Sequence, residues 1–149
     1  MGELVHAPRA EGRILLIEPR RLAAKAAATR LAESIGEPVG KRVGYSVRNE
    51  QQRSDTTTIE AITDGLFLRR LQSQPDLPGV GVVIFDEFHE RRRDSDVALA
   101  LLREARRLLR PDLKLLLMSA TLELEALSAQ FDAADTLTSQ GQAFPVETR

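Results

Sequence analysis

Four short apolar runs along the chain each end in a group of polar residues. The runs are residues 14–17, 58–62, 82–85 and 113–118. Continuous apolar runs of this length are typical of strands that are buried on both faces of a parallel sheet. Helix-like sequence follows three of the runs closely, and a charged segment follows the third. The pattern predicts an α/β fold, a parallel sheet with helices on both faces, whose polar strand ends share one edge.

The segments between the runs supply the remaining elements. Ala and Leu dominate the sequence after the first run, so a helix is expected over Pro19–Ser34. Strands are expected over Val43–Val47 and Thr56–Thr63, with Asn49–Asp55 between them as a polar surface turn. The spacing of Leu and Phe then predicts a short helix over Asp64–Gln72.

A longer helix is expected after the third run. Asp94 or Ser95 is predicted to cap it, and the helix extends to Leu109. Its buried face is predicted to carry Val97, Leu101, Ala105 and Leu108. One more helix at residues 123–130 and an edge strand at residues 135–139 complete the expected fold.

The strand ends carry the candidate chemistry. Asp86 and Glu87 directly follow the third run, at the end of a strand where open α/β sheets bind ligands. Two adjacent acids alone are equally compatible with a polar loop. The other three runs also end in distinctive groups, which are Glu18-Pro19-Arg20-Arg21, Thr63-Asp64-Gly65 and Ser119-Ala120-Thr121. The series, more than any one group, indicates a reaction site.

In this order, the strand ends resemble the motifs of the DEAH-box ATP-dependent RNA helicases of superfamily 2. Asp86-Glu87-Phe88-His89 resembles motif II, and Ser119-Ala120-Thr121 resembles motif III. Residues 18–24 resemble motif Ia, and Thr63-Asp64-Gly65 resembles motif Ib. The sequence around motif II and the closing Phe144-Pro145-Val146-Glu147 are similar to the bacterial HrpB-type branch. The resemblance extends from about Gly12 to the end of the chain and implies a RecA-like, P-loop NTPase fold.

The resemblance also implies a catalytic set. Asp86 would hold Mg²⁺ through its water shell, and Glu87 would orient and deprotonate the water that attacks the terminal phosphate of ATP. His89 would link these acids to Ser119 and Thr121, whose hydroxyls would couple hydrolysis to strand separation. The plain alternatives are a surface or helix-capping histidine and an ordinary turn at a strand end.

A second set of residues would contact nucleic acid. Arg20 and Arg21 combine two guanidinium groups with the free N–H groups of a helix start, next to Pro19, which suits a backbone phosphate. In Thr63-Asp64-Gly65 a polar side chain can cap a helix, and the glycine allows close approach. Such contacts imply sequence-independent binding of single-stranded RNA. Alternatively, these charges are solvated at ordinary helix ends, as expected for Arg91-Arg92-Arg93.

The phosphate loop of the family is missing from the sequence. No G-x-x-x-x-G-K-[ST] segment occurs in the 149 residues, and the only Gly-Lys pair, Gly40-Lys41, is followed by Arg42. In the family this loop precedes motif Ia, and a second domain closes over the nucleotide. We therefore expect residues 1–149 to form an N-terminally truncated first helicase domain, with the missing domains encoded separately or lost. The isolated chain is expected not to hydrolyse ATP.

Composition adds few constraints. Lys and Arg number 21 against 22 Asp and Glu, so nucleic acid would be attracted only by local clusters of charge. There are no cysteines, which excludes disulfides and thiolate metal sites, and no apolar run approaches the length of a membrane span. A cytoplasmic protein is expected. Two other functions stay open: a non-catalytic remnant or interaction module, and a fragment of a superfamily 2 DNA helicase.

Overall fold

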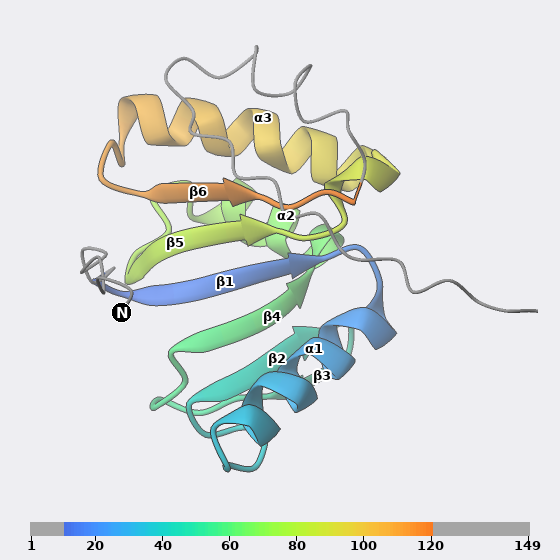
Figure 1. Ribbon diagram of the computed structural model, residues 1–149. Coiled ribbons are helices and arrows are strands. Elements are labelled where there is room, and N and C mark those ends of the chain that lie inside the picture. The colour runs from blue at the N-terminus through green and yellow to red at the C-terminus, as the bar shows by residue number, and fades with distance from the viewer. Residues whose placement is uncertain (1–10, 121–149) are drawn as a thin grey trace, which may run out of the picture.

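The fold is built on one six-stranded sheet (Figure 1). The structure is a computed structural model that describes residues 11–120. In chain order the strands are β1 (Arg13–Glu18), β2 (Val43–Val47), β3 (Glu50–Gln52), β4 (Ile59–Thr63), β5 (Val80–Phe85) and β6 (Lys114–Leu117). In space they follow the order β3-β2-β4-β1-β5-β6, and all neighbours are parallel except β2 and β3. The expected parallel α/β sheet is confirmed.

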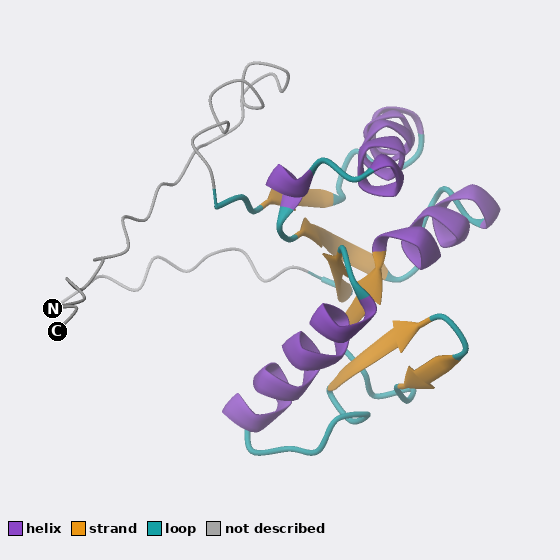
Figure 2. Ribbon diagram, turned by 90° about the vertical axis from the view of Figure 1, so that its right-hand side faces the viewer, coloured by secondary structure: helices purple, strands orange, loops and turns teal. Residues whose placement is uncertain are grey.

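Helices cover both faces of this sheet (Figures 1 and 2). Helix α1 (Arg21–Ser34) lies on one face, and helices α2 (Asp64–Ser73) and α3 (Arg93–Leu108) lie on the other. A short 3₁₀ turn, η1 (Phe88–Glu90), follows β5. No helix within residues 11–120 is long and apolar enough to cross a membrane.

The central strand β1 contributes side chains to both hydrophobic cores because its side chains alternate between the two faces. Leu15 and Ile17 pack into the cluster formed with α2 and α3, whereas Leu16 packs into the cluster formed with α1. The residues that α1 buries are all small: Ala24, Ala27, Ala28 and Ala32. Because alanine has no long side chain, α1 can lie close to the sheet, and this fixes its first turn near the carboxyl end of β1.

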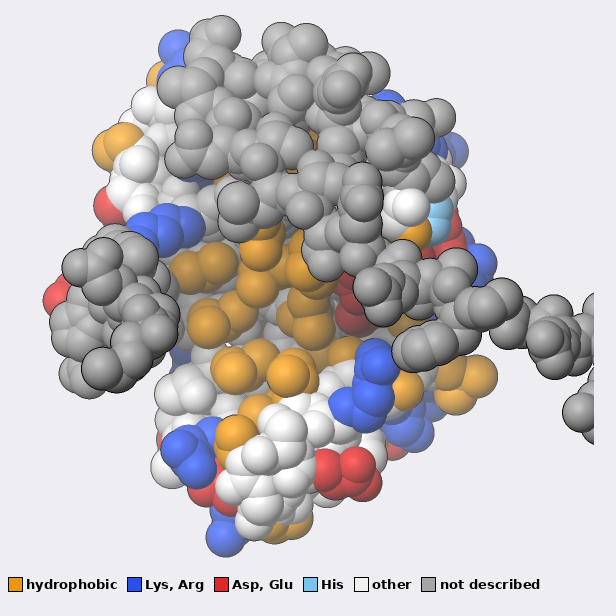
Figure 3. All heavy atoms as spheres, in the orientation of Figure 1, with side chains coloured by type: hydrophobic (Ala, Val, Ile, Leu, Met, Phe, Trp, Pro, Cys, Tyr) orange, Lys and Arg blue, Asp and Glu red, His pale blue; other side chains and the backbone are white. Residues whose placement is uncertain are grey.

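Strand β6 forms one edge of the described sheet. Its residue Leu116 pairs in register with Ile84, which packs on the α1 side, so Leu116 points to the same side. Leu116 is 48% exposed, and apolar side chains are visible on this face of the sheet beyond α1 (Figure 3). Helix α1 therefore covers only part of its face within the described residues.

The predicted buried face of α3 is wrong. Val97 and Leu101 are each 40% exposed and Leu108 is 62% exposed, so of the predicted residues only Ala105 is buried. The helix instead turns Ser95, Ala98, Leu99, Leu102 and Ala105 inward. This face is about one residue, or roughly 100°, away from the predicted one. Large apolar residues occur on both faces of α3, and the small residues allow close packing against α2.

Other boundaries also differ from the predictions. Helix α1 begins at Arg21 with Arg20 as its N-cap, so Pro19 precedes the helix. Helix α3 has Arg92 at its N-cap position without a capping side-chain bond, and the predicted caps lie inside its first turn. The expected surface turn at residues 49–55 contains β3, which pairs with β2 as a hairpin. The elements expected at residues 123–130 and 135–139 lie outside the described residues.

Candidate functional site

The polar strand ends meet at one edge of the sheet, as expected for parallel strands (Figure 1). Thr63 at the end of β4 pairs in register with Glu18 at the end of β1. On the other side of β1, the N–H of Asp86 donates to the carbonyl of Ile17 at 2.9 Å. Strand β1 therefore separates the Thr63 group from the Asp86 group by its own width.

The two acids after β5 occupy a tight turn. The carboxylate Oδ1 of Asp86 accepts the N–H of Glu87 at 2.8 Å. Glu87 has φ 53° and ψ 34°, in the left-handed region that residues other than glycine rarely adopt. The turn directs the Glu87 carboxylate outward, where its side chain is 46% exposed.

His89 connects Glu87 to the end of β6. Its Nε2 lies 3.1 Å from Oε2 of Glu87, and its Nδ1 accepts the N–H of Ala120 at 3.1 Å. Because Nδ1 is an acceptor, a neutral His89 carries its proton on Nε2, the nitrogen that faces Glu87. The predicted link of His89 to the hydroxyls of Ser119 and Thr121 stays a prediction, because the contact that the structure gives is with the backbone of Ala120 and Thr121 lies outside the described residues.

Phe88 anchors the turn between these polar groups. Its side chain is 2% exposed and packs edge-on against Phe85, with ring centroids 5.9 Å apart. Its N–H donates to the carbonyl of Met118 at 3.0 Å, and the N–H of Met118 donates to the carbonyl of Phe85 at 2.8 Å. The end of β6 is thus held against the acidic turn, which places Ala120 within reach of His89.

Glu18 belongs to this site, although the sequence analysis assigned it no role. It is 3% exposed at the end of β1. Burial, a hydrogen bond with Asp86 and the charges of Asp86 and Glu87 raise the pKa of Glu18 to about 8, although the charge of Arg30 opposes the shift. At neutral pH Glu18 is therefore mainly a neutral carboxylic acid beside Asp86. Its position after a buried strand, like that of Asp86, was the signal available in the sequence.

The predicted arginines stand at the start of α1, where both are exposed. Arg20 forms an ion pair with Glu90 at 3.2 Å, and Arg21 forms one with Glu50 at 3.0 Å. Hydrogen bonds from Tyr45, Arg21 and Lys25 lower the pKa of Glu50 to about 2. Both arginines therefore have acidic partners at the protein surface.

The motif at the start of α2 divides into accessible and buried residues. Thr63 takes the N-cap position without a capping side-chain bond. Asp64 is 3% exposed and accepts hydrogen bonds from the N–H of Gly65 at 2.8 Å, from Arg92 at 2.8 Å and from Ser95 at 3.1 Å. Arg92 is an exposed residue just before α3, as expected, but its side chain is held by Asp64. The Asp64 side chain joins α2 to α3, while Thr63 and Gly65 are only partly buried.

The structure thus brings Asp86, Glu87, His89 and Ser119 together on one side of β1, with Thr63 and Gly65 on the other. Arg20 and Arg21 lie between them at the start of α1, and charged side chains gather at this edge of the molecule (Figure 3). Pro19 is buried beneath this edge. Within residues 11–120, no group of three or more His, Cys, Asp or Glu is arranged to hold a metal ion.

Comparisons with known proteins agree with this geometry. The model of the DEAD/DEAH box helicase family matches residues 3–129. The chain is 47% identical over 147 residues to the ATP-dependent RNA helicase HrpB of Escherichia coli (strain K12). The aligned region covers 99% of this chain but 18% of that protein.

Solved structures give the same result. The crystal structure of the Escherichia coli DEAH/RHA helicase HrpB superposes with a TM-score of 0.88 at 47% identity, over 97% of this chain and 18% of that chain. A crystal structure of the E. coli DExH-box NTPase HrpB gives 0.84 at 46% identity, over 95% of this chain and 18% of that one. The RecA-like fold is confirmed. This chain belongs to the DEAD/DEAH box helicase family.

Proposed function

We propose that this chain supplies the catalytic acids and part of the nucleic-acid surface of an ATP-dependent RNA helicase. The observation that carries the proposal is the chain of contacts from Glu87 through His89 to the backbone of Ala120. An ordinary strand-end turn has no need of a histidine that joins an exposed carboxylate to a neighbouring strand. Such a histidine is needed in a hydrolytic site whose structural changes are transmitted to a second element.

The residues present fit a magnesium nucleotide. Mg²⁺ prefers oxygen ligands and usually keeps several waters, with one or two carboxylates and substrate phosphates completing its shell. The lack of a three-ligand cluster within the described residues suits this mode better than a protein cage. Asp86 would hold the ion, which would neutralise charge on the phosphates. Asp86 is held in place by the N–H of Glu87, which donates to its Oδ1 at 2.8 Å.

Glu87 is assigned as the general base. Its exposed carboxylate can accept a proton from water, and Nε2 of His89 lies 3.1 Å from its Oε2, close enough to restrict the position of the carboxylate. A change in the position of Glu87 then reaches Ala120 through the same imidazole. We assign Ser119 and Thr121, on either side of Ala120, to coupling between hydrolysis and strand separation.

Single-stranded RNA is assigned to the other half of the edge. Arg20 and Arg21 at the start of α1, with the hydroxyl of Thr63 at the start of α2, offer donors to backbone phosphates, and Gly65 has no side chain that would block the strand. Pro19 and Asp64 are buried beside these two helix starts, and Asp64 binds Arg92. Single-stranded DNA offers the same phosphates, and the RNA helicase HrpB as a relative favours RNA. Because the relative HrpB is a bacterial RNA helicase, we also propose a cytoplasmic location.

One observation favours a second candidate function. The 149 residues contain no phosphate loop, so a non-catalytic interaction module that has kept the fold is the alternative. The chain spans 18% of the length of the HrpB proteins that it matches, and we propose that the phosphate loop and a second domain act together with it.

The test uses the chain alone and joined to those parts. The purified 149-residue chain is expected to show no RNA-stimulated ATP hydrolysis. A chimera with the phosphate-loop segment and second domain of Escherichia coli HrpB is expected to hydrolyse ATP. If the chimera folds and binds RNA but lacks ATPase activity, the interaction-module function is the better one. If the chain alone turns over ATP and Glu87→Gln abolishes the turnover, the assigned need for a phosphate loop is wrong.

A further inference from the structure

The segment Glu90–Arg92, at the end of the turn after β5, contacts both helix starts that we assign to RNA. On one side Arg20, the N-cap residue of α1, forms its ion pair of 3.2 Å with Glu90. On the other side Nε of Arg92 donates to Oδ2 of Asp64, the first residue of α2, at 2.8 Å. Neither the catalytic assignment nor the RNA assignment makes use of these two contacts.

The contact between the starts of α2 and α3 is buried. The Asp64 side chain is 4% exposed, which leaves too little surface to bind RNA itself. Its Oδ2 accepts hydrogen bonds from Arg92 and from Ser95, which is in the first turn of α3. A Cβ atom added to Gly65 would lie 3.2 Å from Oδ2 of Asp94, so the two helix starts also fit closely there. Because a buried carboxylate is costly to separate from its cation, these two starts should move together.

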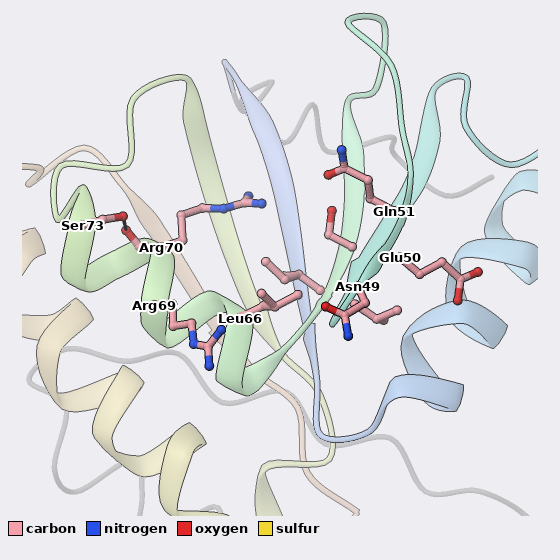
Figure 4. A pocket seen from close by; sticks show the side chains of 10 residues that line it. Asn49, Glu50, Gln51, Leu66, Arg69, Arg70 and Ser73 are labelled. Atoms are coloured by element: carbon pink, nitrogen blue, oxygen red, sulfur yellow. Dashed lines mark hydrogen bonds between the residues drawn. The ribbon is translucent and has the colours of Figure 1, made fainter.

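The opposite side of α2 has more space. A cavity of about 740 Å³ lies between this helix and the hairpin of β2 and β3, and Leu66 and Arg69 line it from α2 (Figure 4). The start of α2 can shift toward this space without displacing closely packed side chains. On the α3 side the same shift moves the partners of Asp64. A displacement of α2 is therefore passed on toward α3.

The backbone between α3 and the acidic turn is held in an unusual conformation. Arg91 has φ 48°, in the left-handed region that residues other than glycine rarely adopt. Its Nε donates to Asp96 on α3 at 3.0 Å, and its guanidinium lies 5.6 Å from the ring centre of Phe88. Strained residues persist only where their neighbours hold them. A shift at the start of α3 should therefore reach Phe88 and, next along the chain, His89.

We propose that Asp64, Glu90 and Arg92 are positioning residues that transmit RNA binding to the acidic turn. RNA at the start of α2 displaces Asp64 together with Arg92. A phosphate bound by Arg20 releases Glu90. RNA shifts the turn because it favours the arrangement in which Arg20 is free over the arrangement in which Arg20 is paired. Both changes act on the turn that holds His89. This inference rests on the proposed function, which supplies the RNA surface and the role of His89.

The experiment follows the imidazole of His89 by NMR in the 149-residue chain. The sequence contains two histidines, so a His6→Gln reference protein leaves His89 as the only imidazole observed. The ¹⁵N-labelled protein is titrated to saturation with a single-stranded oligoribonucleotide at constant pH. The expected result is a shift of the His89 ring signals that saturates together with the backbone amide shifts of Arg20 and Thr63.

Two substitutions in the reference protein remove the two contacts separately. Asp64→Asn keeps the shape of the side chain and removes the buried charge, while Arg92, whose side chain is 43% exposed, stays hydrated. The fold should therefore survive. Glu90→Gln removes the ion-pair partner of Arg20. Each variant should reduce the His89 shift at saturation, and the double variant should lose it. The amide shifts at both helix starts should persist in all three.

Two further variants separate transmission from a general effect of charge. Arg92→Lys keeps a cation for the buried carboxylate and should retain the His89 shift that Asp64→Asn reduces. Arg93→Gln is the matched control, because Arg93 is exposed and its side chain forms no hydrogen bond or ion pair within residues 11–120. It should leave the His89 shift unchanged, and a reduction there would contradict the inference.

The remaining outcomes distinguish this inference from the proposed function. A full His89 shift in the double variant would overturn the inference and leave the RNA surface intact. Loss of the Thr63 amide shift in Asp64→Asn would show that Asp64 only supports the RNA surface, and would also overturn it. So would amide shifts at both helix starts without any His89 shift in the reference protein. Shifts at no position up to the highest oligonucleotide concentration would overturn the RNA assignment of the proposed function itself.

Discussion

The guanidinium of Arg20 lies 3.2 Å from the carboxylate of Glu90, and this ion pair joins the start of α1 to the turn after β5 that follows Asp86 and Glu87. The Arg20 side chain is 67% exposed and that of Glu90 is 22% exposed. An exposed pair of this kind contributes about 0.2–1 kcal/mol. A nucleic-acid phosphate can therefore replace Glu90 as the partner of Arg20 at little cost.

The first prediction follows from this competition. Glu90→Gln should strengthen binding of a single-stranded oligoribonucleotide up to about fivefold, because Arg20 no longer has to leave a carboxylate. Arg20→Gln should weaken binding and reduce its salt dependence. Fluorescence anisotropy at two salt concentrations measures both effects. Weaker binding by the Glu90 variant would contradict the competition, and two unrelated oligonucleotide sequences control for base preference.

The second prediction concerns the general base. In the chimera with a phosphate loop and a second domain, Glu87→Gln should keep ATP and RNA binding and reduce the turnover number by at least about 100-fold, since only the base is removed. Steady-state ATPase assays and nucleotide-binding titrations separate these effects. Turnover at the unmutated rate would show that Glu87 is not the base.

The third prediction concerns coupling. Ser119→Ala combined with Thr121→Ala in the same chimera should spare most ATP hydrolysis and damage strand separation. The reason is that the acids and His89 stay in place, while the hydroxyls beside Ala120 are lost. Parallel ATPase and duplex-unwinding assays measure the two activities. An equal loss of both would assign these residues to the hydrolytic site itself.

The fourth prediction concerns stability. Glu60 is buried, and burial alone would raise its pKa. Hydrogen bonds from Arg70 and Ser46, together with the charges of Arg70 and Arg53, outweigh burial and lower the pKa of Glu60. Arg70→Met should reduce the free energy of unfolding by about 3 kcal/mol at neutral pH, because it leaves a buried carboxylate poorly compensated. Arg53→Met is the control: its contact with Glu60 is longer, at 3.4 Å, and its loss should matter less.

The pH dependence of that effect has a definite sign. A lowered folded-state pKa means that Glu60 stabilises the fold above its unfolded-state pKa of about 4.3, and that this contribution is lost as pH falls through the lower folded value. In Arg70→Met the burial of Glu60 raises its pKa instead. Protonation of Glu60 at low pH then removes the cost of burying its charge in the variant. Urea unfolding across this range should show the two proteins converging as pH falls. A constant difference would contradict the role of Glu60.

The sequence predicted the layout of the site better than its individual contacts. Polar groups after apolar runs correctly placed Asp86, His89, Arg20 and Thr63 at one edge, because parallel strands end together. Asp64 was expected to cap a helix start and to contact nucleic acid, or to be a solvated charge there. Its burial depends on Arg92, which lies 28 residues further along the chain, and no local pattern records that contact.

Two other differences have similar causes. Glu18 was grouped with the arginines that follow it, although its side chain turns toward Asp86 across the β1–β5 pair. The buried face of α3 was assigned from large residues, whereas the close packing of helices selected Ala98 and Ser95. In each case a tertiary neighbour, rather than the local sequence, determined where the side chain points.

The position of β1 between β4 and β5 has a consequence for how the two halves of the edge communicate. Two strand spacings amount to about 10 Å, close to the Debye length in 0.1 M salt. Direct attraction or repulsion between a phosphate near Thr63 and the carboxylate of Asp86 is thus largely screened in the cell. Displacement of the β1 backbone, whose hydrogen bonds hold both neighbouring strands, is a route between the two halves that salt does not screen. If the two halves are coupled through β1, the coupling should tolerate salt far better than RNA binding does.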